Sequence, residues 1–277
     1  MSRFRLVAAD LDGTLLDPGG QVTEKTRAVA RALATAGITL VLATSRRFTG
    51  AAPIAKALDL SGPLILCDGA QLREYPGGTI LASNALDMLV ARSVVEIIYA
   101  HGLRPIAQTS EQHRERLLVA PAPCVVWDAN YLTLFADQIV EVPIEALCDG
   151  GVNPLRVVAF GDPKRLRAAA DEIGTLQCGW QILDMGNYGT AELTVFSPTA
   201  SKGNTLEILA KRMGIPLSET FAIGDGINDV SLLSTAGFSV AMGNAVEEVR
   251  AVAQALARPN WEGGAADSIL RYVLEAE

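Results

Sequence analysis

The chain has 277 residues, of which 49% are hydrophobic and 5% aromatic, and its formal net charge at pH 7 is −8. An acidic chain is not expected to bind nucleic acid or an anionic membrane surface, because both require a basic face. No apolar run approaches the ~18 residues of a membrane span, and the first strand begins almost at the N-terminus, so we expect no signal peptide and a cytoplasmic protein.

The first part of the chain alternates between strand-like and helix-like segments. In order, the sequence predicts a strand at 6–9, a helix at 23–36, a strand at 38–43, a helix around Pro53, a strand at 64–67 and a hairpin at 71–81. The helix at 23–36 is indicated by an apolar stripe of helical period, and the strands are indicated by short continuous apolar runs. Strands that alternate with helices in this way are typical of a parallel doubly wound sheet.

The pattern changes between residues 85 and 189. The sequence predicts a helix at 86–101, several strand-like pieces between 103 and 142 whose order it leaves open, a strand at 155–160, a helix at 163–173, and strands at 176–183 and 191–196. This arrangement is typical of an α+β block in which helices cover a mostly antiparallel sheet.

From Ser201 the first pattern resumes. The predicted elements are a helix at 201–214, a strand at 220–224, a short helix, a strand at 238–242 and a final helix at 245–257. We therefore expect an α/β fold with a doubly wound (Rossmann-like) parallel sheet core, formed by residues 1–84 and 190–277. Residues 85–189 are expected to form an inserted α+β cap domain, joined to the core by two crossings that suit a lid.

Acidic side chains follow two of the predicted core strands. Asp10 and Asp12 follow the first strand, and Asp225 and Asp229 follow the strand at 220–224. Ligands bind at the carboxyl ends of strands in open parallel sheets. Clustered carboxylates repel one another, and a divalent cation on oxygen ligands relieves the repulsion. Each motif alone is also compatible with a surface turn or a helix cap, but their joint occurrence favours a metal site.

Lys202 supplies a positive charge in the first turn of a predicted helix. A cation there opposes the helix macrodipole unless an anion lies beside it, and an exposed lysine is the alternative. A phosphate monoester would add nearly two negative charges to the four aspartates, which Mg²⁺ and Lys202 would offset. The carboxylates of Asp10 and Asp225 and the carbonyl of Asp12 are suitable Mg²⁺ ligands.

The motifs Asp-Leu-Asp-Gly-Thr-Leu at 10–15, Thr-Ser-Arg at 44–46, Ser-Lys-Gly at 201–203 and Gly-Asp-Gly-Ile-Asn-Asp at 224–229 together resemble the haloacid dehalogenase-like hydrolase superfamily. More narrowly, they resemble its Cof-type phosphatase branch with a large IIB-type cap. The resemblance implies these roles: Asp10 as nucleophile, Asp12 as general acid and base, Thr44, Lys202 and Asn228 at the phosphoryl group, and Asp10, Asp12, Asp225 and Asp229 at the metal. Asn228 is alternatively expected to orient Asp229.

Basic residues offer further substrate contacts. Arg46 is a candidate contact for the outer end of the substrate, with a solvated helix start as the alternative. In the cap, a solvated face is favoured over contacts to an anionic substrate tail for the following residues: Arg104, His113, Arg114 and Arg116.

Three segments of the chain depart from the family pattern. Ser45 replaces the glycine of the usual Thr-Gly-Arg motif, and Asp68 stands where relatives commonly have asparagine. Glu262-Gly263-Gly264 replaces an Asp-Gly-Val loop. Asp68 adds a negative charge near the expected site, which we expect to affect substrate choice.

The leading hypothesis is a Mg²⁺-dependent phosphatase that hydrolyses a small phosphorylated metabolite, expected to be a sugar phosphate, through an aspartyl-phosphate. A phosphomutase on the same scaffold is the alternative, because the motifs do not separate the two. A non-catalytic binding protein is disfavoured, since nucleophile, acid, lysine and metal aspartates are all present. The sequence leaves the substrate and the oligomeric state open.

Overall fold

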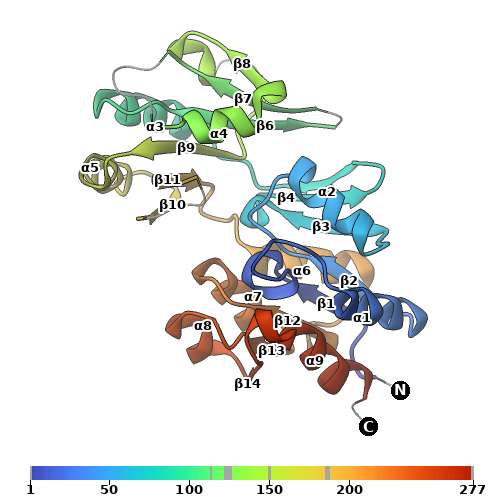
Figure 1. Cartoon of the computed structure of the whole chain (residues 1–277). Coiled ribbons are helices and arrows are strands. Elements are labelled where there is room, and N and C mark those ends of the chain that lie inside the picture. Colours follow the sequence, from blue (N-terminus) through green and yellow to red (C-terminus); the bar gives the residue numbers. More distant parts are fainter. Residues whose placement is uncertain (1, 113, 122–126, 149–150, 185–187, 276–277) are drawn as a thin grey trace. The chain divides into compact units, whose positions relative to one another are not determined.

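The computed structural model describes residues 2–112, 114–121, 127–148, 151–184 and 188–275 (Figure 1). It divides into a core unit, Met1–Ala82 with Ser201–Glu277, and an inserted unit, Ser83–Ala200. Within the described ranges, no helix combines the length and apolarity that crossing a membrane would require.

The core unit is built on a parallel sheet. Its strands are β1 (Leu6–Ala9), β2 (Thr39–Leu42), β12 (Thr220–Gly224), β13 (Phe238–Ala241) and β14 (Ala255–Leu256). They pair in the order β14-β13-β12-β1-β2, and each of these ladders is parallel. Every residue of β1 and β12 is buried. This explains their continuous apolar runs, because helices cover both faces of a parallel sheet.

The strand order reverses between β1 and β12. The chain passes from β1 to β2 through α1 (Glu24–Thr35), and from β12 to β13 in the opposite direction through α7 (Val230–Thr235). Because such crossovers are right-handed, the two helices lie on opposite faces of the sheet. Accordingly α1 packs against α9 (Gly264–Ile269), whereas α7 packs against α6 (Lys202–Met213). The carboxyl ends of the neighbouring strands β1 and β12 therefore mark the topological switch point, where ligands bind in such folds.

The third predicted strand joins this sheet only at its end. β3 (Gly62–Leu66) is connected to the residue after β2 by a parallel bridge between Ala43 and Ile65. It then forms an antiparallel sheet with β4 (Gln71–Tyr75) and β5 (Ile80–Ser83), the hairpin that the sequence predicts. The helix α2 (Phe48–Ala57) precedes β3 and packs against β4.

The predicted final helix at 245–257 is wrong in its extent. The structure has a short helix, α8 (Glu247–Val252), followed by β14, which pairs with β13. The helix stops because Ala253 adopts an extended conformation, and the next backbone groups bond to the edge of the sheet instead. The helix α9 that follows Gly263 was not predicted.

The inserted unit contains a mixed sheet with helices. Its elements are α3 (Met88–Ala100), β6 (Ile106–Glu111), β7 (Arg114–Val119), α4 (Ala129–Leu134), β8 (Ile139–Glu141), β9 (Arg156–Gly161), α5 (Pro163–Ile173), β10 (Gly179–Leu183) and β11 (Ala191–Phe196). The strand order is β10-β11-β9-β6-β7-β8, with a parallel ladder between β7 and β8 and antiparallel ladders elsewhere. Because β11 pairs with β9 and β10, the inserted unit runs to residue 200 and not to the expected 189.

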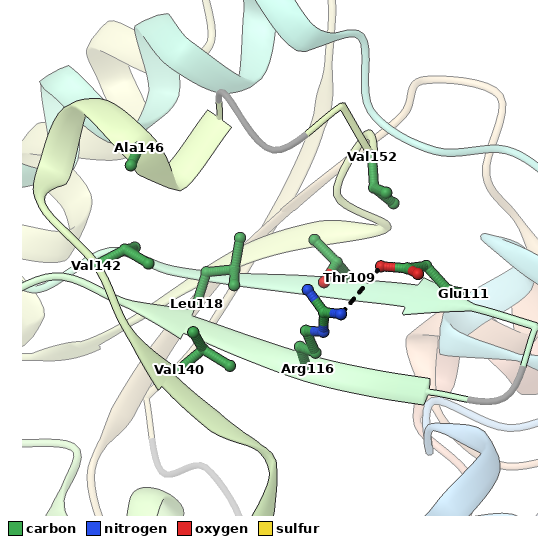
Figure 2. A pocket seen from close by; sticks show the side chains of 8 residues that line it. All are labelled: Thr109, Glu111, Arg116, Leu118, Val140, Val142, Ala146 and Val152. Atoms are coloured by element: carbon green, nitrogen blue, oxygen red, sulfur yellow. Dashed lines mark ion pairs between the residues drawn. The ribbon is translucent and has the colours of Figure 1, made fainter.

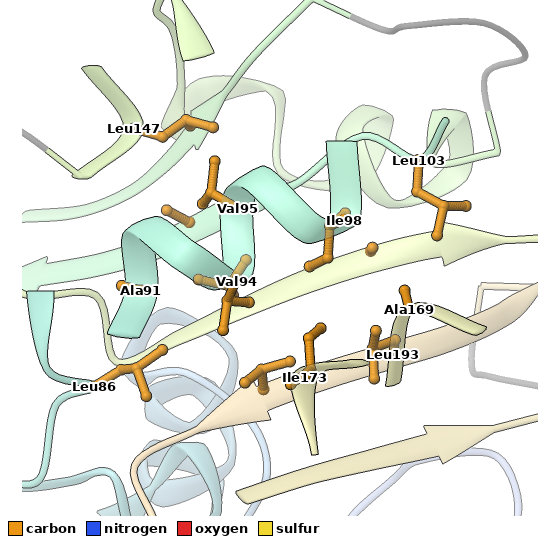
Figure 3. Packing of buried hydrophobic residues seen from close by; sticks show 14 of the residues in the cluster. Leu86, Ala91, Val94, Val95, Ile98, Leu103, Leu147, Ala169, Ile173 and Leu193 are labelled. Carbon is orange, nitrogen blue, oxygen red and sulfur yellow. The ribbon is translucent and has the colours of Figure 1, made fainter. Parts of the chain in front are cut away.

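Alternate residues of the central strands serve two separate cores, because side chains alternate along a strand. Val157 and Ala159 of β9 face α3 and α5, in the cluster that Figure 3 shows. Val158 and Phe160 face the other way, toward Tyr131 of α4. The sequence did not predict α4, whose single strongly buried residue carries little helical signal.

The helix α3 offers a test of this packing, because its two sides differ sharply in exposure. Ile98 is fully buried against α5, whereas Leu89 is 74% exposed. We predict that Ile98→Ala lowers the free energy of unfolding by about 2–5 kcal/mol, and that Leu89→Ala changes it by less than about 0.5 kcal/mol. Urea unfolding followed by tryptophan fluorescence measures this difference, and equal losses would contradict the assigned face.

Candidate active site

The predicted motif residues come together at the carboxyl edge of the core sheet, beside the switch point. Asp10 directly follows β1, and its amide donates to the carbonyl of Ile223 in β12 at 3.0 Å. Asp225 directly follows β12, and Lys202 is the first residue of α6. The α6 N-terminus is fixed because the Ser201 hydroxyl accepts from the amide of Asn204. Segments almost 200 residues apart in sequence therefore meet within one unit.

Lys202 is the centre of this arrangement. Its side chain is fully buried, and its Nζ donates to Oδ1 of Asp10 at 2.7 Å and to Oδ1 of Asp229 at 2.6 Å. Burial alone would lower the pKa of Lys202, but the charges of Asp10 and Asp229 more than offset this and raise it above its ordinary value. The lysine is thus a permanent cation, and the predicted alternative of an exposed lysine is wrong.

Asp10 and Asp229 occupy buried positions with different surroundings. Burial raises the pKa of Asp10 well above its ordinary value, although the Lys202 ammonium opposes this. Asp229 uses its second oxygen, Oδ2, to accept from the amides of Asp225 at 2.9 Å and Gly226 at 3.0 Å. Asp229 therefore ties the loop after β12 to the buried lysine.

Asp225 is held by neighbours from two other loops. Its Oδ1 accepts from the Thr14 hydroxyl at 3.0 Å, and its Oδ2 accepts from the Asn244 amide at 3.1 Å. Gly13, with φ at +84°, permits this approach, because a Cβ there would lie 2.2 Å from Oδ2 of Asp225. Burial and the charge of Asp229 raise the pKa of Asp225 to about 6, against the effects of Thr14 and Lys202.

Oxygen atoms of Asp10, Asp225 and Asp229 lie within 4.8 Å of one another. Hard oxygen donors in such a cluster fit Mg²⁺. Burial, and after it the charge of Asp229, raises the pKa of Asp225, and a cation beside Asp225 would favour the charged carboxylate. The Asp12 carboxylate is not part of this cluster, and the ligand predicted at Asp12 is its backbone carbonyl, which stays a prediction. The residues present therefore fit a divalent cation held by Asp10 and Asp225, with Asp229 also bound to Lys202.

Asp12 instead pairs with Arg46. The guanidinium donates from Nε to Oδ2 of Asp12 at 2.8 Å and from Nη2 to Oδ1 at 2.6 Å. This bidentate geometry fixes the plane of the carboxylate. The carboxylate of Asp12 remains about half exposed. Arg46, expected at the substrate or in solvent, thus orients Asp12 in this structure.

Thr44 and Asn228 are each hydrogen-bonded to Asp68. Thr44 is fully buried, and its hydroxyl accepts from the amide of Arg46 at 3.1 Å. Asn228 donates from Nδ2 to Oδ1 of Asp68 at 2.8 Å. The departure at Asp68 is therefore in direct contact with a predicted phosphate-binding residue.

Two asparagines join this network that the sequence analysis missed. Asn244 donates to the carbonyl of Gly13 as well as to Asp225, and its Oδ1 accepts from the amide of Asn260. Asn260 in turn donates to the carbonyl of Leu16 at 2.9 Å. Asn244 follows β13, so the rule about carboxyl strand ends, applied to that strand, was the signal that could have found it. Asn260 carries no comparable signal.

The other two departures lie in connecting loops. Ser45 is partly buried in the loop between β2 and α2. Glu262–Gly264 lies in the turn before α9, where Gly263 has φ at +74°. A Cβ at Gly264, the first residue of α9, would lie 1.9 Å from the carbonyl oxygen of Arg258, so the position requires glycine. Nothing in the structure explains the replacements at Ser45 and Glu262.

A cavity of about 280 Å³ lies within the inserted unit (Figure 2). Its lining residues are Thr109, Glu111, Arg116, Leu118, Val140, Val142, Ala146 and Val152. Arg116 faces Glu111, with Nη2 and Oε1 3.7 Å apart, and its buried Nε has no hydrogen-bond partner among the described residues.

The basic residues of the cap differ in their surroundings. Arg104 lies 3.4 Å from the buried carboxylate of Asp128, and Arg114 is exposed. The predicted solvated face is thus wrong for Arg104 and Arg116. His113 lies outside the described residues.

Known proteins resemble this chain over most of its length. The family of haloacid dehalogenase-like hydrolases matches residues 7–269. The chain is 28% identical over 255 residues to an HMP-PP phosphatase of Serratia proteamaculans (strain 568), which covers 90% of this chain and 87% of that protein. It is 29% identical over 280 residues to a pyridoxal phosphate phosphatase of Escherichia coli (strain K12), with 97% of each chain covered.

Among solved structures, a haloacid dehalogenase-like hydrolase from Bacteroides thetaiotaomicron has a TM-score of 0.80 at 25% identity, covering 97% of this chain and 99% of that chain. The fold class and the family that the motifs predict are both confirmed. The chain belongs to the haloacid dehalogenase-like hydrolases.

Proposed function

We propose that this protein is a Mg²⁺-dependent phosphatase that hydrolyses a small phosphorylated metabolite through an aspartyl-phosphate on Asp10. The observation that carries the proposal is the buried Lys202 ammonium between Asp10 and Asp229 at the switch point. Two of its three N–H donors serve these carboxylates, and the third is suited to a phosphoryl oxygen. The named phosphatases among its relatives support the same reaction.

The first step forms a bond between Asp10 and phosphorus while the bond to the leaving oxygen breaks. With Oδ1 of Asp10 bound to Lys202, we assign the attack to Oδ2. Asp12 gives a proton to the leaving oxygen. In the second step Asp12 takes a proton from water, whose oxygen attacks phosphorus and releases inorganic phosphate and the Asp10 carboxylate.

The surrounding residues stabilise the charge of the transferred group. We assign Lys202 and the Thr44 hydroxyl as donors to phosphoryl oxygens, and Asn228 as a further donor. Asp10 and Asp225 would hold Mg²⁺, with Asp229 in support. When bound, Mg²⁺ would neutralise negative charge on the phosphoryl oxygens. Both oxygens of Asp12 accept from Arg46 in this structure, which orients the carboxylate. To act as the acid, a protonated Asp12 gives up one of these two bonds.

The substrate is proposed only as a class. The relatives' names concern HMP-PP and pyridoxal phosphate, which supports a small phosphorylated metabolite and hydrolysis in preference to the mutase alternative. A sugar phosphate and a cytoplasmic location stay predictions of the sequence. A panel of sugar phosphates, phosphorylated cofactors and nucleotides, assayed with Mg²⁺ for released phosphate, tests the proposal; no release from any member would contradict it.

The raised pKa of Asp225 gives a prediction about metal binding. A folded pKa of about 6, above the ordinary 3.8, means that the charged carboxylate destabilises the metal-free fold as pH rises through 6. Mg²⁺ requires that charged form. The Mg²⁺ concentration for half-maximal thermal stabilisation should therefore stay level above about pH 7 and rise roughly tenfold per pH unit below about pH 6.

Two substitutions, one at the proposed ligand and one as a control, test this prediction. Asp225→Asn should abolish most of the stabilisation, whereas Asp59→Asn, at an exposed aspartate beyond α2, should leave it intact. The measurement is differential scanning fluorimetry with a Mg²⁺ titration at each pH. A half-maximal concentration that does not vary between pH 5 and pH 8 would contradict a Mg²⁺ ligand that titrates near pH 6.

A second prediction separates Asp10 from Asp12. Asp10→Asn should abolish the first step for every substrate, because an amide is a poor nucleophile. Asp12→Asn should slow that step by ~10²–10⁴-fold for an alkyl phosphate, whose leaving oxygen needs a proton. It should slow the step far less for p-nitrophenyl phosphate, whose phenolate leaves without one.

The measurement is single-turnover release of the leaving group in rapid-quench experiments. Single turnover isolates the first step, because loss of the base would also slow hydrolysis of the aspartyl-phosphate. Equal rate losses for the two substrates would exclude Asp12 as the leaving-group acid.

A further inference from the structure

The turn at Cys67–Gly69 is bonded to two of the segments that carry proposed site residues. The amide of Asp68 donates to the carbonyl of Thr44 at 3.1 Å. The hydroxyl of Thr205, in the first turns of α6, donates to the carbonyl of Gly69 at 2.7 Å. The turn therefore bridges the loop after β2 and the helix that carries Lys202.

The backbone of this turn is held in an uncommon conformation. Cys67, Asp68 and Gly69 have successive φ values of +52°, +55° and +91°, in the left-handed region that residues other than glycine rarely adopt. Gly69 packs so tightly that a Cβ would lie 2.1 Å from the carbonyl oxygen of Ser201. Such a conformation persists only where surrounding contacts impose it, and it is found at functional sites.

This conformation directs the Asp68 side chain toward the proposed phosphoryl site. Its Oδ1 accepts from Nδ2 of Asn228 at 2.8 Å. Its charge also acts on Lys202: burial lowers the pKa of Lys202, while Asp10, Asp229 and then Asp68 raise it. Asp68 thus contacts one proposed phosphate ligand and lies within electrostatic range of another.

The hydrogen bond alone does not require an aspartate. An asparagine would offer its amide oxygen to Asn228 and tolerates left-handed backbone well. What the aspartate adds is a negative charge beside Asn228, next to a site that already contains Asp10, Asp225 and Asp229.

We propose that Asp68 is a specificity-determining residue that disfavours phosphate esters whose leaving group carries a second negative charge. Esters with neutral or cationic leaving groups are accepted, since the Asp68 carboxylate does not repel them. A second role is positioning: Asp68 fixes the amide of Asn228. The inference rests on the proposed function for the identity of the site.

Glycerol 3-phosphate and 3-phosphoglycerate provide a matched pair of probes, because they differ only in a hydroxymethyl group in place of a carboxylate. Each is measured as an inhibitor of p-nitrophenyl phosphate hydrolysis. Asp68→Asn should improve the inhibition constant of 3-phosphoglycerate on the order of tenfold relative to glycerol 3-phosphate, as expected for one charge pair ~10 Å apart at an effective dielectric of ~20.

Asp59→Asn is the matched control, because Asp59 is an exposed aspartate with the same φ of +55°. It should leave the ratio of the two inhibition constants unchanged. A ratio in Asp68→Asn within about twofold of the wild type, on the scale of that Coulomb effect, would overturn the specificity proposal.

Asp68→Ala tests the positioning role. It should lower kcat/KM for p-nitrophenyl phosphate, while Asp68→Asn keeps it, because only the asparagine still accepts from Asn228. Equal kcat/KM values in the two variants would overturn that role. Thermal melts of both variants establish that they are folded.

The outcome also separates this inference from the proposed function. Absence of phosphate release from every ester in the presence of Mg²⁺ would contradict the phosphatase. The charge discrimination is then measured without turnover, as the difference in thermal stabilisation by the same two esters in wild type and Asp68→Asn. No change in that difference would overturn the role of Asp68 by itself.

Discussion

A lysine ammonium buried between two aspartates is the interaction on which the rest of the site depends. Charges are removed from water at high cost unless they are paired in good geometry. Lys202 meets this condition with contacts of 2.7 and 2.6 Å to Asp10 and Asp229. Because the cation cannot leave its partners, the start of α6, the end of β1 and the loop after β12 are held in fixed relative positions.

The remaining polar contacts connect this arrangement to Asp225, which is a proposed metal ligand. Asp229 binds the amide of Asp225, and Asn244 binds both Asp225 and the carbonyl of Gly13. Each carboxylate therefore has a defined orientation before any ligand arrives. Such preorganisation is what electrostatic stabilisation of a phosphoryl group requires, since the groups need not reorient during the reaction.

The aspartates of the site differ in whether a positively charged side chain pairs with them. Arg46 pairs with Asp12, and Lys202 pairs with Asp10 and Asp229. For Asp225, burial and the charge of Asp229 raise the pKa to about 6. A divalent cation would complete the balance on that side. The Asp68 carboxylate adds a further negative charge beside Asn228, and this charge is the basis of the proposed selection among esters.

The sequence alone indicated the α/β core, the inserted unit and the meeting of Asp10, Lys202 and Asp225 at one edge of the sheet, for a physical reason. Continuous apolar runs mark strands buried on both faces, and polar residues at their carboxyl ends must lie at one edge of a parallel sheet. Asp12 was found as well, but not its partner, because an ion pair between loops leaves no periodic pattern.

Only the tertiary structure decided which of these residues contact one another. The pairing of Arg46 with Asp12, the contact of Asn228 with Asp68 and the place of Asn244 depend on distances between loops that are far apart in sequence. The same holds for β11, whose apolar run fits either unit until its hydrogen bonds to β9 and β10 assign it to the insertion. Local pattern specifies which surface a segment buries, whereas partners are chosen by packing of the whole chain.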